Sequence, residues 1–159
     1  MAKKKGQSDA PTIENRRARH DYHIGDTMEV GIVLQGSEVK SIRDGRVSLA
    51  EGYVRAVEEP PELMVHGVRI EEYPPAAGLN QHDPGRNRVL LAHKKEIRKF
   101  ARESMQKGVT IVPLKMYFKN GRVKLLIGLA SGKAEYDKRQ DVKKKEADRD
   151  IRRAMTKRR

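Results

Sequence analysis

The feature that most constrains the fold is an Asn120-Gly121 dipeptide between two stretches of alternating apolar residues, 110–119 and 122–130. Asn-Gly is typical of a two-residue type I′ turn, and that loop length sets the register of the flanking strands. In this register four apolar pairs share one face: Phe118–Val123, Met116–Leu125, Leu114–Ile127 and Val112–Leu129. The sequence therefore predicts an antiparallel hairpin with one buried face.

The opposite face of this hairpin is basic. Lys119 is expected opposite Arg122, and Tyr117 opposite Lys124. Like charges placed opposite each other cost stability, so we expect this face to have a function; the alternative is a merely solvated outer face. Pro113 lacks the N–H that a ladder needs, which predicts that its strand has a free side there.

Patterns along the rest of the chain predict further strands and two helices. Strands are expected over 16–34, near 52–57 and over 63–70, and a loop over 73–88. A short helix is expected over 38–44, capped by Ser37 and stopped by Gly45. The clearest helix is 93–107. The fold class indicated is mainly β, a small closed or partly open antiparallel barrel of the oligonucleotide-binding type with about two to three flanking helices; the five-stranded form is the leading candidate.

Charge divides the chain into parts. Residues 133–159 hold twelve Lys/Arg against six Asp/Glu, a net of +6 out of the formal +13, so the body is basic too. So polar a stretch cannot bury enough surface to offset the entropy of ordering its backbone, roughly 1–2 kcal/mol per residue. We expect a disordered N-terminal arm over 1–14, a barrel domain over 15–132, and a basic C-terminal tail over 133–159 that is disordered when free.

The tail nevertheless contains a helical pattern. Ala147, Ile151, Ala154 and Met155 are spaced to share one face of a helix. A single helix of this kind is marginal alone in water, so the pattern predicts a tail that becomes helical when it binds a partner.

Composition excludes several classes of function. No run of about 18 apolar residues is present to span a membrane. Without cysteine there is no disulfide framework, thiolate metal site or thiol nucleophile, and the five histidines lack a repeated ligand spacing. We therefore expect a cytoplasmic, non-enzymatic protein with no cofactor, no metal and no membrane partner. The basic charge favours nucleic acid, with RNA the first to consider.

Two segments carry candidate RNA contacts. Residues 15–22 place three arginines, a histidine and Tyr22 within eight positions. Guanidinium groups match phosphate oxygens, and Tyr22 can stack on a base or pack in the barrel. The loop 83–88 adds Arg86 and Arg88. Only seven residues are aromatic, too few for a long stacking platform, so a folded RNA read by shape and phosphate fits better than a threaded single strand.

Six ordered motifs carry a resemblance to a known family. They are Asn-Arg-Arg-Ala-Arg-His-Asp-Tyr at 15–22, Gly-Ile-Val-Leu-Gln-Gly-Ser-Glu-Val-Lys-Ser at 31–41 with Arg-Asp-Gly at 43–45, His-Asp-Pro-Gly-Arg at 82–86, Leu-Leu-Ala-His-Lys-Lys-Glu-Ile at 90–97, Val-Pro-Leu-Lys-Met-Tyr-Phe-Lys-Asn-Gly-Arg at 112–122, and Gly-Lys at 132–133 with Tyr-Asp-Lys-Arg at 136–139. In order and spacing the chain closely resembles the small protein B family, the SsrA (tmRNA)-binding proteins of bacterial trans-translation, from about Ile13 to Arg153.

The resemblance implies a function and two sets of residues. It implies a barrel that binds the tRNA-like domain of tmRNA and delivers it to stalled ribosomes, where the tail engages the decoding centre and mRNA channel; a monomer is expected. The RNA-facing set it implies is Asn15, Arg17, Arg19, His20, Tyr22, Glu29, Lys40, Arg43, Arg86, Arg88, Leu91 and Lys119. The ribosome-engaging set is Gly132, Lys133, Tyr136, Asp137, Lys138 and Arg139. Val89, Ala134 and His23 depart from the family pattern.

Glu29 stands apart in this set because an acid repels phosphate. If it belongs to the site, it must accept hydrogen bonds or orient an arginine such as Arg19; otherwise it is a solvated strand carboxylate. Two alternatives to the adaptor function are a general barrel-type binder of single-stranded RNA or translation factor, and an RNA-processing enzyme. The low aromatic count disfavours the first, and the missing acid–base or metal constellation disfavours the second.

Overall fold

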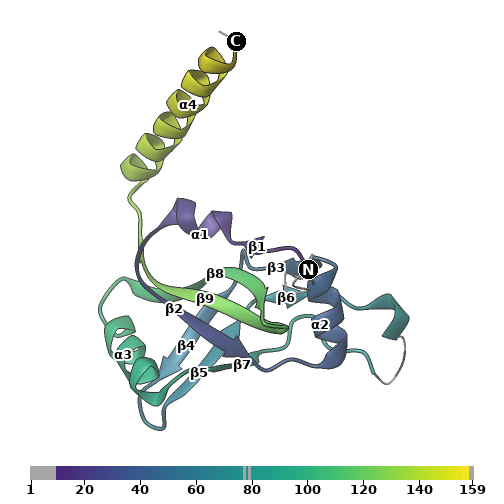
Figure 1. The fold of residues 1–159 in the computed structure, drawn as a ribbon. Coiled ribbons are helices and arrows are strands. Elements are labelled where there is room, and N and C mark those ends of the chain that lie inside the picture. Colours follow the sequence, from purple (N-terminus) through teal and green to yellow (C-terminus); the bar gives the residue numbers. More distant parts are fainter. Residues whose placement is uncertain (1–9, 77, 79, 158–159) are drawn as a thin grey trace, which may run out of the picture.

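The computed structural model describes residues 10–76, 78 and 80–157. Its centre is an antiparallel ring of six strands (Figure 1). In ring order these strands are β8 (Val109–Lys119), β4 (Tyr53–Val57), β5 (Glu62–His66), β7 (Arg88–Leu91), β2 (Tyr22–Ile32) and β9 (Arg122–Gly132), and β9 pairs back with β8. The predicted mainly β, barrel-type fold is therefore confirmed.

The ring is closed unevenly. The β8–β9 and β2–β9 ladders are long, whereas β4 meets β8 at the single pair Val54–Ile111. The ring also has one strand more than the five-stranded form, because β7 lies between β5 and β2. Short β1 (Ile13–Glu14) adds to β8, and β3 (Val47–Ser48) pairs with β6 (Arg69–Ile70) in a separate ladder. The barrel is thus closed by long ladders at β2, β9 and β8, and by a single residue pair between β4 and β8.

The Asn120-Gly121 turn sets the register as predicted, but only for half of the hairpin. Both turn residues have positive φ, as a type I′ turn requires. The pairs run as expected from Lys119–Arg122 to Lys115–Leu126. The register then shifts by one residue, so Pro113 pairs with Ile127 and Val112 with Gly128. The predicted pairs Leu114–Ile127 and Val112–Leu129 are wrong.

A β-bulge at Pro113-Leu114 causes this shift. Pro113 lies between two strand partners of β8, because β4 pairs at Ile111 and β1 at Lys115 and Met116. The predicted free side at Pro113 is therefore confirmed. Asn15 occupies it: its Nδ2 donates to the Pro113 carbonyl (2.8 Å), and its backbone N–H donates to the Leu114 carbonyl (2.8 Å).

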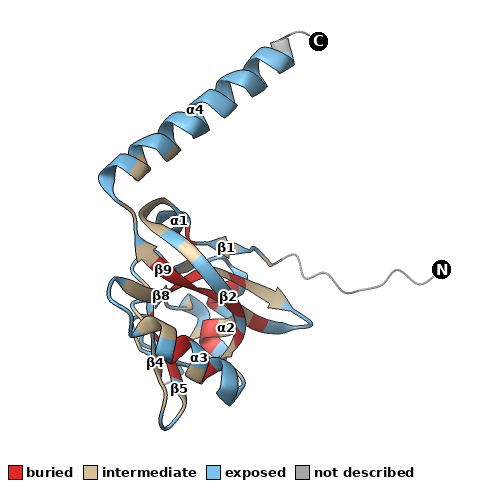
Figure 2. Ribbon diagram, turned by 90° about the vertical axis from the view of Figure 1, so that its left-hand side faces the viewer, coloured by how far each residue is buried: buried red, intermediate tan, exposed pale blue. Residues whose placement is uncertain are grey.

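The bulge divides the hydrophobic residues into two clusters. The barrel interior holds the main core, which includes Val30, Leu63, Leu125 and Ile127. Figure 2 shows all buried residues in red, most of them on the strands and the inner sides of the helices. Val112 and Leu114 instead turn outward and join Ala18 and Ala130 in a second, smaller cluster. Gly128 makes room for this, since a Cβ there would lie 2.9 Å from Leu114 Cδ1.

The second cluster holds helix α1 (Arg16–Asp21) on the barrel, where the sequence pattern predicted strand. The Asn15 side chain caps α1 by accepting from the Ala18 N–H (3.0 Å). Helix α2 (Gly36–Arg43) is near its predicted position, but Gln35 rather than Ser37 is its N-cap. Helix α3 (Lys94–Ser104) lies within the predicted range 93–107, follows His93 and buries Ile97, Phe100 and Ala101. The loop expected over 73–88 contains a 3₁₀ turn at Pro74–Ala76.

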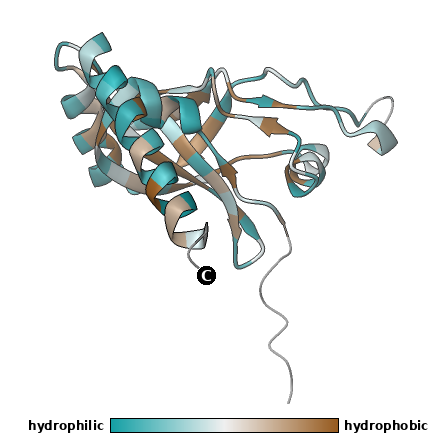
Figure 3. Ribbon diagram, turned by 90° about the horizontal axis from the view of Figure 1, so that it is seen from above, coloured by the Kyte–Doolittle hydropathy of each residue, from teal (hydrophilic) through white to brown (hydrophobic). Residues whose placement is uncertain are grey.

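The tail leaves the barrel at Gly132 and forms one helix, α4 (Glu135–Lys157), which projects away from the strands (Figures 1 and 2). Figure 3 shows hydrophilic residues along most of it and apolar ones toward its C-terminal end. The disorder expected of the free tail stays a prediction. At the other terminus, β1 extends the folded domain to Ile13, two residues before the expected boundary at 15. Residues 1–9 of the expected disordered arm lie outside the described residues.

Candidate nucleic-acid interface

One candidate surface, here called the sheet face, lies on the outside of β7, β2, β9 and β8. It consists of Leu91, Glu29, Lys124, Tyr117 and Lys119. The ladder brings them together, because Gly31 pairs with both Leu91 and Lys124, and Lys124 pairs with Tyr117. Gly31 has no side chain to separate them, and a Cβ there would lie 3.4 Å from the Leu91 Cβ. Leu91 is 57% exposed, so an apolar contact is available among cations.

Glu29 is the only acid of the sheet face, and it accepts hydrogen bonds from within it. The Tyr117 hydroxyl donates to Glu29 Oε2, and Lys119 Nζ donates to Oε1 at 3.1 Å. The bonds from Tyr117 and Lys119 lower the pKa of Glu29, while burial and the Glu29 carboxylate raise the pKa of Tyr117 to about 12. Of the two roles open to Glu29 as a site residue, accepting hydrogen bonds or orienting an arginine such as Arg19, the structure shows the first, with Tyr117 and Lys119 as donors.

Helix α2 carries two cation–π contacts, one to a loop residue and one to β8. Lys40 Nζ lies 5.3 Å from the centre of the Tyr73 ring, and the Arg43 guanidinium lies 5.5 Å from that of Phe118. Both cations are exposed. A cation over an aromatic ring is attracted by the ring's quadrupole, so α2 offers two positioned cations.

Two residues of the RNA-facing set have structural roles instead. Arg88 is fully buried, pairs with Glu38 (2.8 Å) and donates to the carbonyl oxygens of Val68, Arg86 and Pro84. Asn15 is buried too, because it caps α1 and donates to the Leu49 and Pro113 carbonyls. Neither presents surface to a partner, which corrects their predicted placement. Arg86 is partly exposed and also pairs with Glu38 (2.5 Å).

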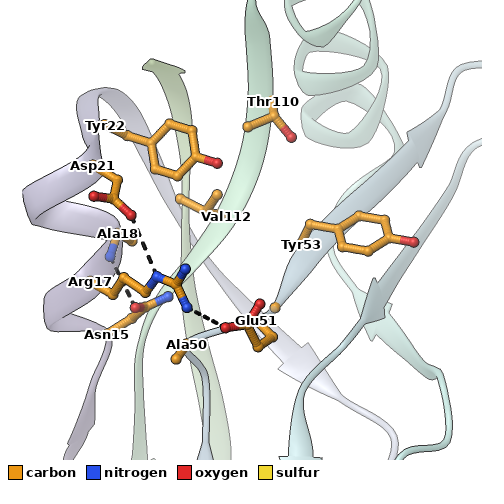
Figure 4. Close-up of a pocket in the computed structure, with 11 residues that line it drawn as sticks. Asn15, Arg17, Ala18, Asp21, Tyr22, Ala50, Glu51, Tyr53, Thr110 and Val112 are labelled. Carbon is orange, nitrogen blue, oxygen red and sulfur yellow. Dashed lines mark hydrogen bonds and ion pairs between the residues drawn. The ribbon is translucent and has the colours of Figure 1, made fainter. Parts of the chain in front are cut away.

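The remaining predicted residues of the N-terminal motif lie on or beside α1, where Arg17 and Tyr22 line a pocket of about 190 Å³ (Figure 4). Arg17 reaches across this pocket, donating to Glu51 and lying 3.5 Å from Asp21. Tyr22 lines the pocket and packs against the second cluster, whereas Arg19 is exposed. His20 bonds Asp21 (2.9 Å). Two acids thus already neutralise Arg17 here, and the available positive charge lies on the outer side of α1.

The start of the tail is bonded to α1 and to the start of β2 through Lys133, Lys138 and Asp137; these contacts are here called the clasp. Lys133 donates from its backbone to the Asp21 carbonyl (2.9 Å), and from Nζ to the Arg19 carbonyl (3.1 Å) and to Asp141. Lys138 lies 3.7 Å from Asp21, and Asp137 lies 3.4 Å from His23. Hydrogen bonding to His20 and the nearby charge of Lys138 lower the pKa of Asp21. Tyr136 and Arg139 are exposed, and Gly132 joins the strand to this clasp.

The predicted residues therefore fall into two groups at opposite ends of β2. The sheet face with α2 brings together Glu29, Lys40, Arg43, Leu91 and Lys119, and α1 with the clasp brings together Arg17, Arg19, His20, Tyr22 and the tail residues. The sequence-based set omitted Tyr117 and Lys124. The hairpin register could have identified both, because it places them opposite each other on the basic face.

Other kinds of site find no support in the described part of the chain. None of its helices is long and apolar enough to cross a membrane. Residues 10–76, 78 and 80–157 also contain no group of three His, Cys, Asp or Glu side chains placed to hold a metal ion.

Comparison with known proteins extends along nearly the whole chain. A family model described as SmpB protein matches residues 12–157. The SsrA-binding protein of Levilactobacillus brevis is 49% identical over 157 residues, covering 98% of each chain. The SsrA-binding protein of Thermobifida fusca is 48% identical over 163 residues, covering 100% of each chain. A solved structure described as "tmRNA-SmpB: a journey to the center of the bacterial ribosome" superposes with a TM-score of 0.66 at 46% identity, over 79% of this chain and 87% of that chain.

Proposed function

The chain belongs to the SmpB protein family, and on that basis we propose that it binds the tRNA-like domain of tmRNA and delivers it to stalled ribosomes for trans-translation. The observation that carries the proposal is the combination of near full-length relatives that are SsrA-binding proteins with an exposed cationic sheet face. The same barrel is similar to a solved chain described with tmRNA and the bacterial ribosome.

We assign the RNA contacts to the sheet face and to α2. Lys119, Lys124, Lys40 and Arg43 supply cations to phosphates, and Leu91 supplies an apolar contact. Asn15 and Arg88 support this surface from below: Asn15 secures the bulge of β8, and Arg88 ties β7 to α2 through Glu38.

We assign the ribosome contacts to the clasp and the tail, and leave the exposed Arg19 of α1 with the RNA-facing residues. Tyr136 and Arg139 are exposed at the start of α4, and Lys133 bonds the Arg19 carbonyl. The tail's twelve cations attract the phosphates of ribosomal RNA, and its six acids limit nonspecific binding. The chain acts as a binding adaptor in the cytoplasm, with no chemical step of its own.

A competition assay tests the proposed RNA partner. The labelled tRNA-like domain of tmRNA is bound to the purified full chain and displaced either by the same RNA or by an unstructured single strand of equal length. Binding to the folded RNA should be much tighter, with a linear fall of log K against log salt that reports several phosphate contacts. Equal affinity for both competitors would indicate a general single-strand binder instead of an adaptor. Cleavage of the RNA during incubation would indicate an enzyme.

A further inference from the structure

His82 is a buried histidine that none of the proposed contacts uses. The residue is 3% exposed, and both of its ring nitrogens have partners from other segments. Nε2 lies 3.0 Å from the Ile70 carbonyl oxygen, and Nδ1 lies 2.9 Å from the Ser37 hydroxyl oxygen. Ser37 belongs to the first turn of α2, and Ile70 ends β6. One imidazole ring therefore connects α2 to β6.

The two partners decide which ring nitrogen carries the hydrogen. A carbonyl oxygen can only accept, so Nε2 of His82 carries the hydrogen and donates it to Ile70. In the neutral ring Nδ1 is then an acceptor, and the Ser37 hydroxyl donates to it. Because the ring is rigid, these two bonds hold the first turn of α2 and the end of β6 at a fixed separation.

Gln81, which precedes His82, holds the segment that follows β6. Its Oε1 accepts from the Tyr73 backbone N–H (3.1 Å), and its Nε2 donates to the Tyr73 carbonyl (2.9 Å). Two bonds to one backbone residue prevent that residue from sliding or turning. Gln81 and His82 together therefore fix both ends of the segment from Ile70 to Tyr73 relative to α2.

The two connected segments meet again at the surface, in the contact between Lys40 and Tyr73. Lys40 lies one turn after Ser37 on α2, and Tyr73 lies three residues after Ile70. Lys40 is exposed, and its Nζ lies 5.3 Å from the centre of the Tyr73 ring. A cation–π contact at an exposed site is weak, and ordering a lysine side chain costs much conformational entropy. The ring can therefore direct the ammonium only if the two backbones are already held at the right distance.

We propose that His82 is a positioning residue for RNA binding, which holds Lys40 over the Tyr73 ring so that the ammonium faces an RNA phosphate. His82 does this by joining Ser37 to Ile70, and it touches no RNA itself because it is buried. A lysine that is ordered before binding loses less conformational entropy when the phosphate arrives. The inference rests on the proposed function and deepens it, since it adds a buried histidine and an aromatic ring to the contact made by α2.

A double-mutant cycle tests this proposal. The affinity of the full chain for the tRNA-like domain is measured at several salt concentrations for wild type, His82→Gln, Lys40→Ala and the double variant. In His82→Gln the amide can still donate toward Ile70, but Ser37 loses its acceptor. Lys40→Ala should weaken binding and lower the slope of log K against log salt by one phosphate contact, roughly 0.7–0.9. His82→Gln should weaken binding by about threefold or more, and should have almost no further effect once Lys40 is absent.

Ser37→Ala is the second test variant, because it removes one of the two bonds and leaves the ring in place. It should weaken binding in the same way, again only while Lys40 is present. Ser104→Ala is the matched control, since the Ser104 hydroxyl donates to the Ala101 carbonyl within α3 (2.9 Å); this variant should bind like the wild type. All affinities are compared at a temperature at which circular dichroism shows each chain to be folded.

Several outcomes would overturn the proposal. Variants of His82 and Ser37 could weaken binding equally with and without Lys40, as a general loss of structure would, or both could bind as tightly as the wild type. A Lys40→Ala chain with unchanged affinity would also overturn it. If the wild-type chain shows no preference for the tRNA-like domain over an unstructured single strand, the proposed function itself fails. If that preference holds and the coupling is absent, only the role of His82 fails.

Discussion

Glu38 is an acid buried with two arginines, and it ties α2 to β7. Its Oε1 accepts from Arg88 Nε (2.8 Å) and Arg86 Nε (2.8 Å), and its Oε2 accepts from the Gln35 backbone N–H (2.7 Å). Every partner is a donor, so the charge is compensated where water is excluded. Breaking such a pair from one side costs far more than an exposed pair is worth, because it leaves an uncompensated buried charge.

We expect Arg88→Met to lower the free energy of unfolding by about 3–5 kcal/mol, since Glu38 would lose its fully buried partner. Urea denaturation at pH 7 measures this. Arg69→Met is the control, because Arg69 pairs with Glu71 on the surface and should cost less than about 1 kcal/mol. RNA affinity of Arg88→Met should change only in proportion to its folded fraction; a selective loss of RNA binding with unchanged stability would return Arg88 to the contact set.

Ionisation of Glu38 should contribute to the pH dependence of the free energy of unfolding. Burial alone would raise the pKa of Glu38, but hydrogen bonds from Arg86, Gln35 and Arg88 outweigh it and hold the pKa below the ordinary value of 4.5. A depressed pKa means that the stabilisation is present above 4.5 and is lost as the pH falls through the folded-state pKa. The gap in unfolding free energy between wild type and Glu38→Gln should therefore be largest near pH 7 and shrink below about pH 4.5. A gap that stays constant down to pH 3 would contradict this.

At the scale of elements, the bulge in β8 decides where the N-terminal motif lies. It turns Val112 and Leu114 to the outside of the barrel, where they form a seat for Ala18 of α1. Asn15 links α1 to the bulge, because it caps α1 and donates hydrogen bonds to the carbonyls of Pro113 and Leu114. The arginines of α1 therefore lie on the surface of a helix that packs on the outside of the barrel, next to the first turn of α4.

Helix α4 contrasts with α1, because most of its described residues are exposed. Only its first turns contact α1, and Ile151 and Met155 are exposed. Helices in proteins owe most of their stability to packing of an apolar face, so we expect the free tail to be largely disordered beyond the clasp. Far-ultraviolet circular dichroism of the full chain, minus that of a chain ending at Gly132, measures this difference. A difference spectrum with the full helicity of a 23-residue helix would contradict the expectation.

The tail's helix should increase when a partner covers its apolar residues. Ala147→Pro serves as the variant, because proline breaks a helix interior at a cost of about 3 kcal/mol. It should leave the urea midpoint of the barrel unchanged and should impair tagging on stalled ribosomes. An Ala147→Pro chain that tags normally would show that the tail does not act as a helix.

At the scale of the whole molecule, RNA binding and ribosome engagement are placed on different parts of one barrel. The sheet face and α2 lie near the end of β2, and α1 with the clasp lies at its start. The tail projects from the second region away from the strands (Figure 1). A single rigid barrel can therefore hold an RNA on one side while its tail reaches a separate partner.

We expect a chain truncated after Gly132 to keep its affinity for the tRNA-like domain within about tenfold, or 1.4 kcal/mol, and to lose tagging on stalled ribosomes. The tail's net charge of +6 adds attraction to any RNA, but the sheet face remains intact. Filter binding and a reconstituted translation assay measure the two activities. A much larger loss of affinity for the free RNA would refute this division of roles.

The sequence by itself determined those features that adjacent residues encode. Asn120-Gly121 and the alternation around it specify the hairpin from Lys119 to Lys115, and the helical period specifies the buried face of α3. Only the tertiary structure decided that 16–21 is a helix seated on Val112 and Leu114, and that Arg88 is buried against Glu38, fifty positions away. The residues next to an arginine in a loop motif are the same whether its side chain faces RNA or a buried acid. That difference depends on contacts between distant segments, which no local pattern contains.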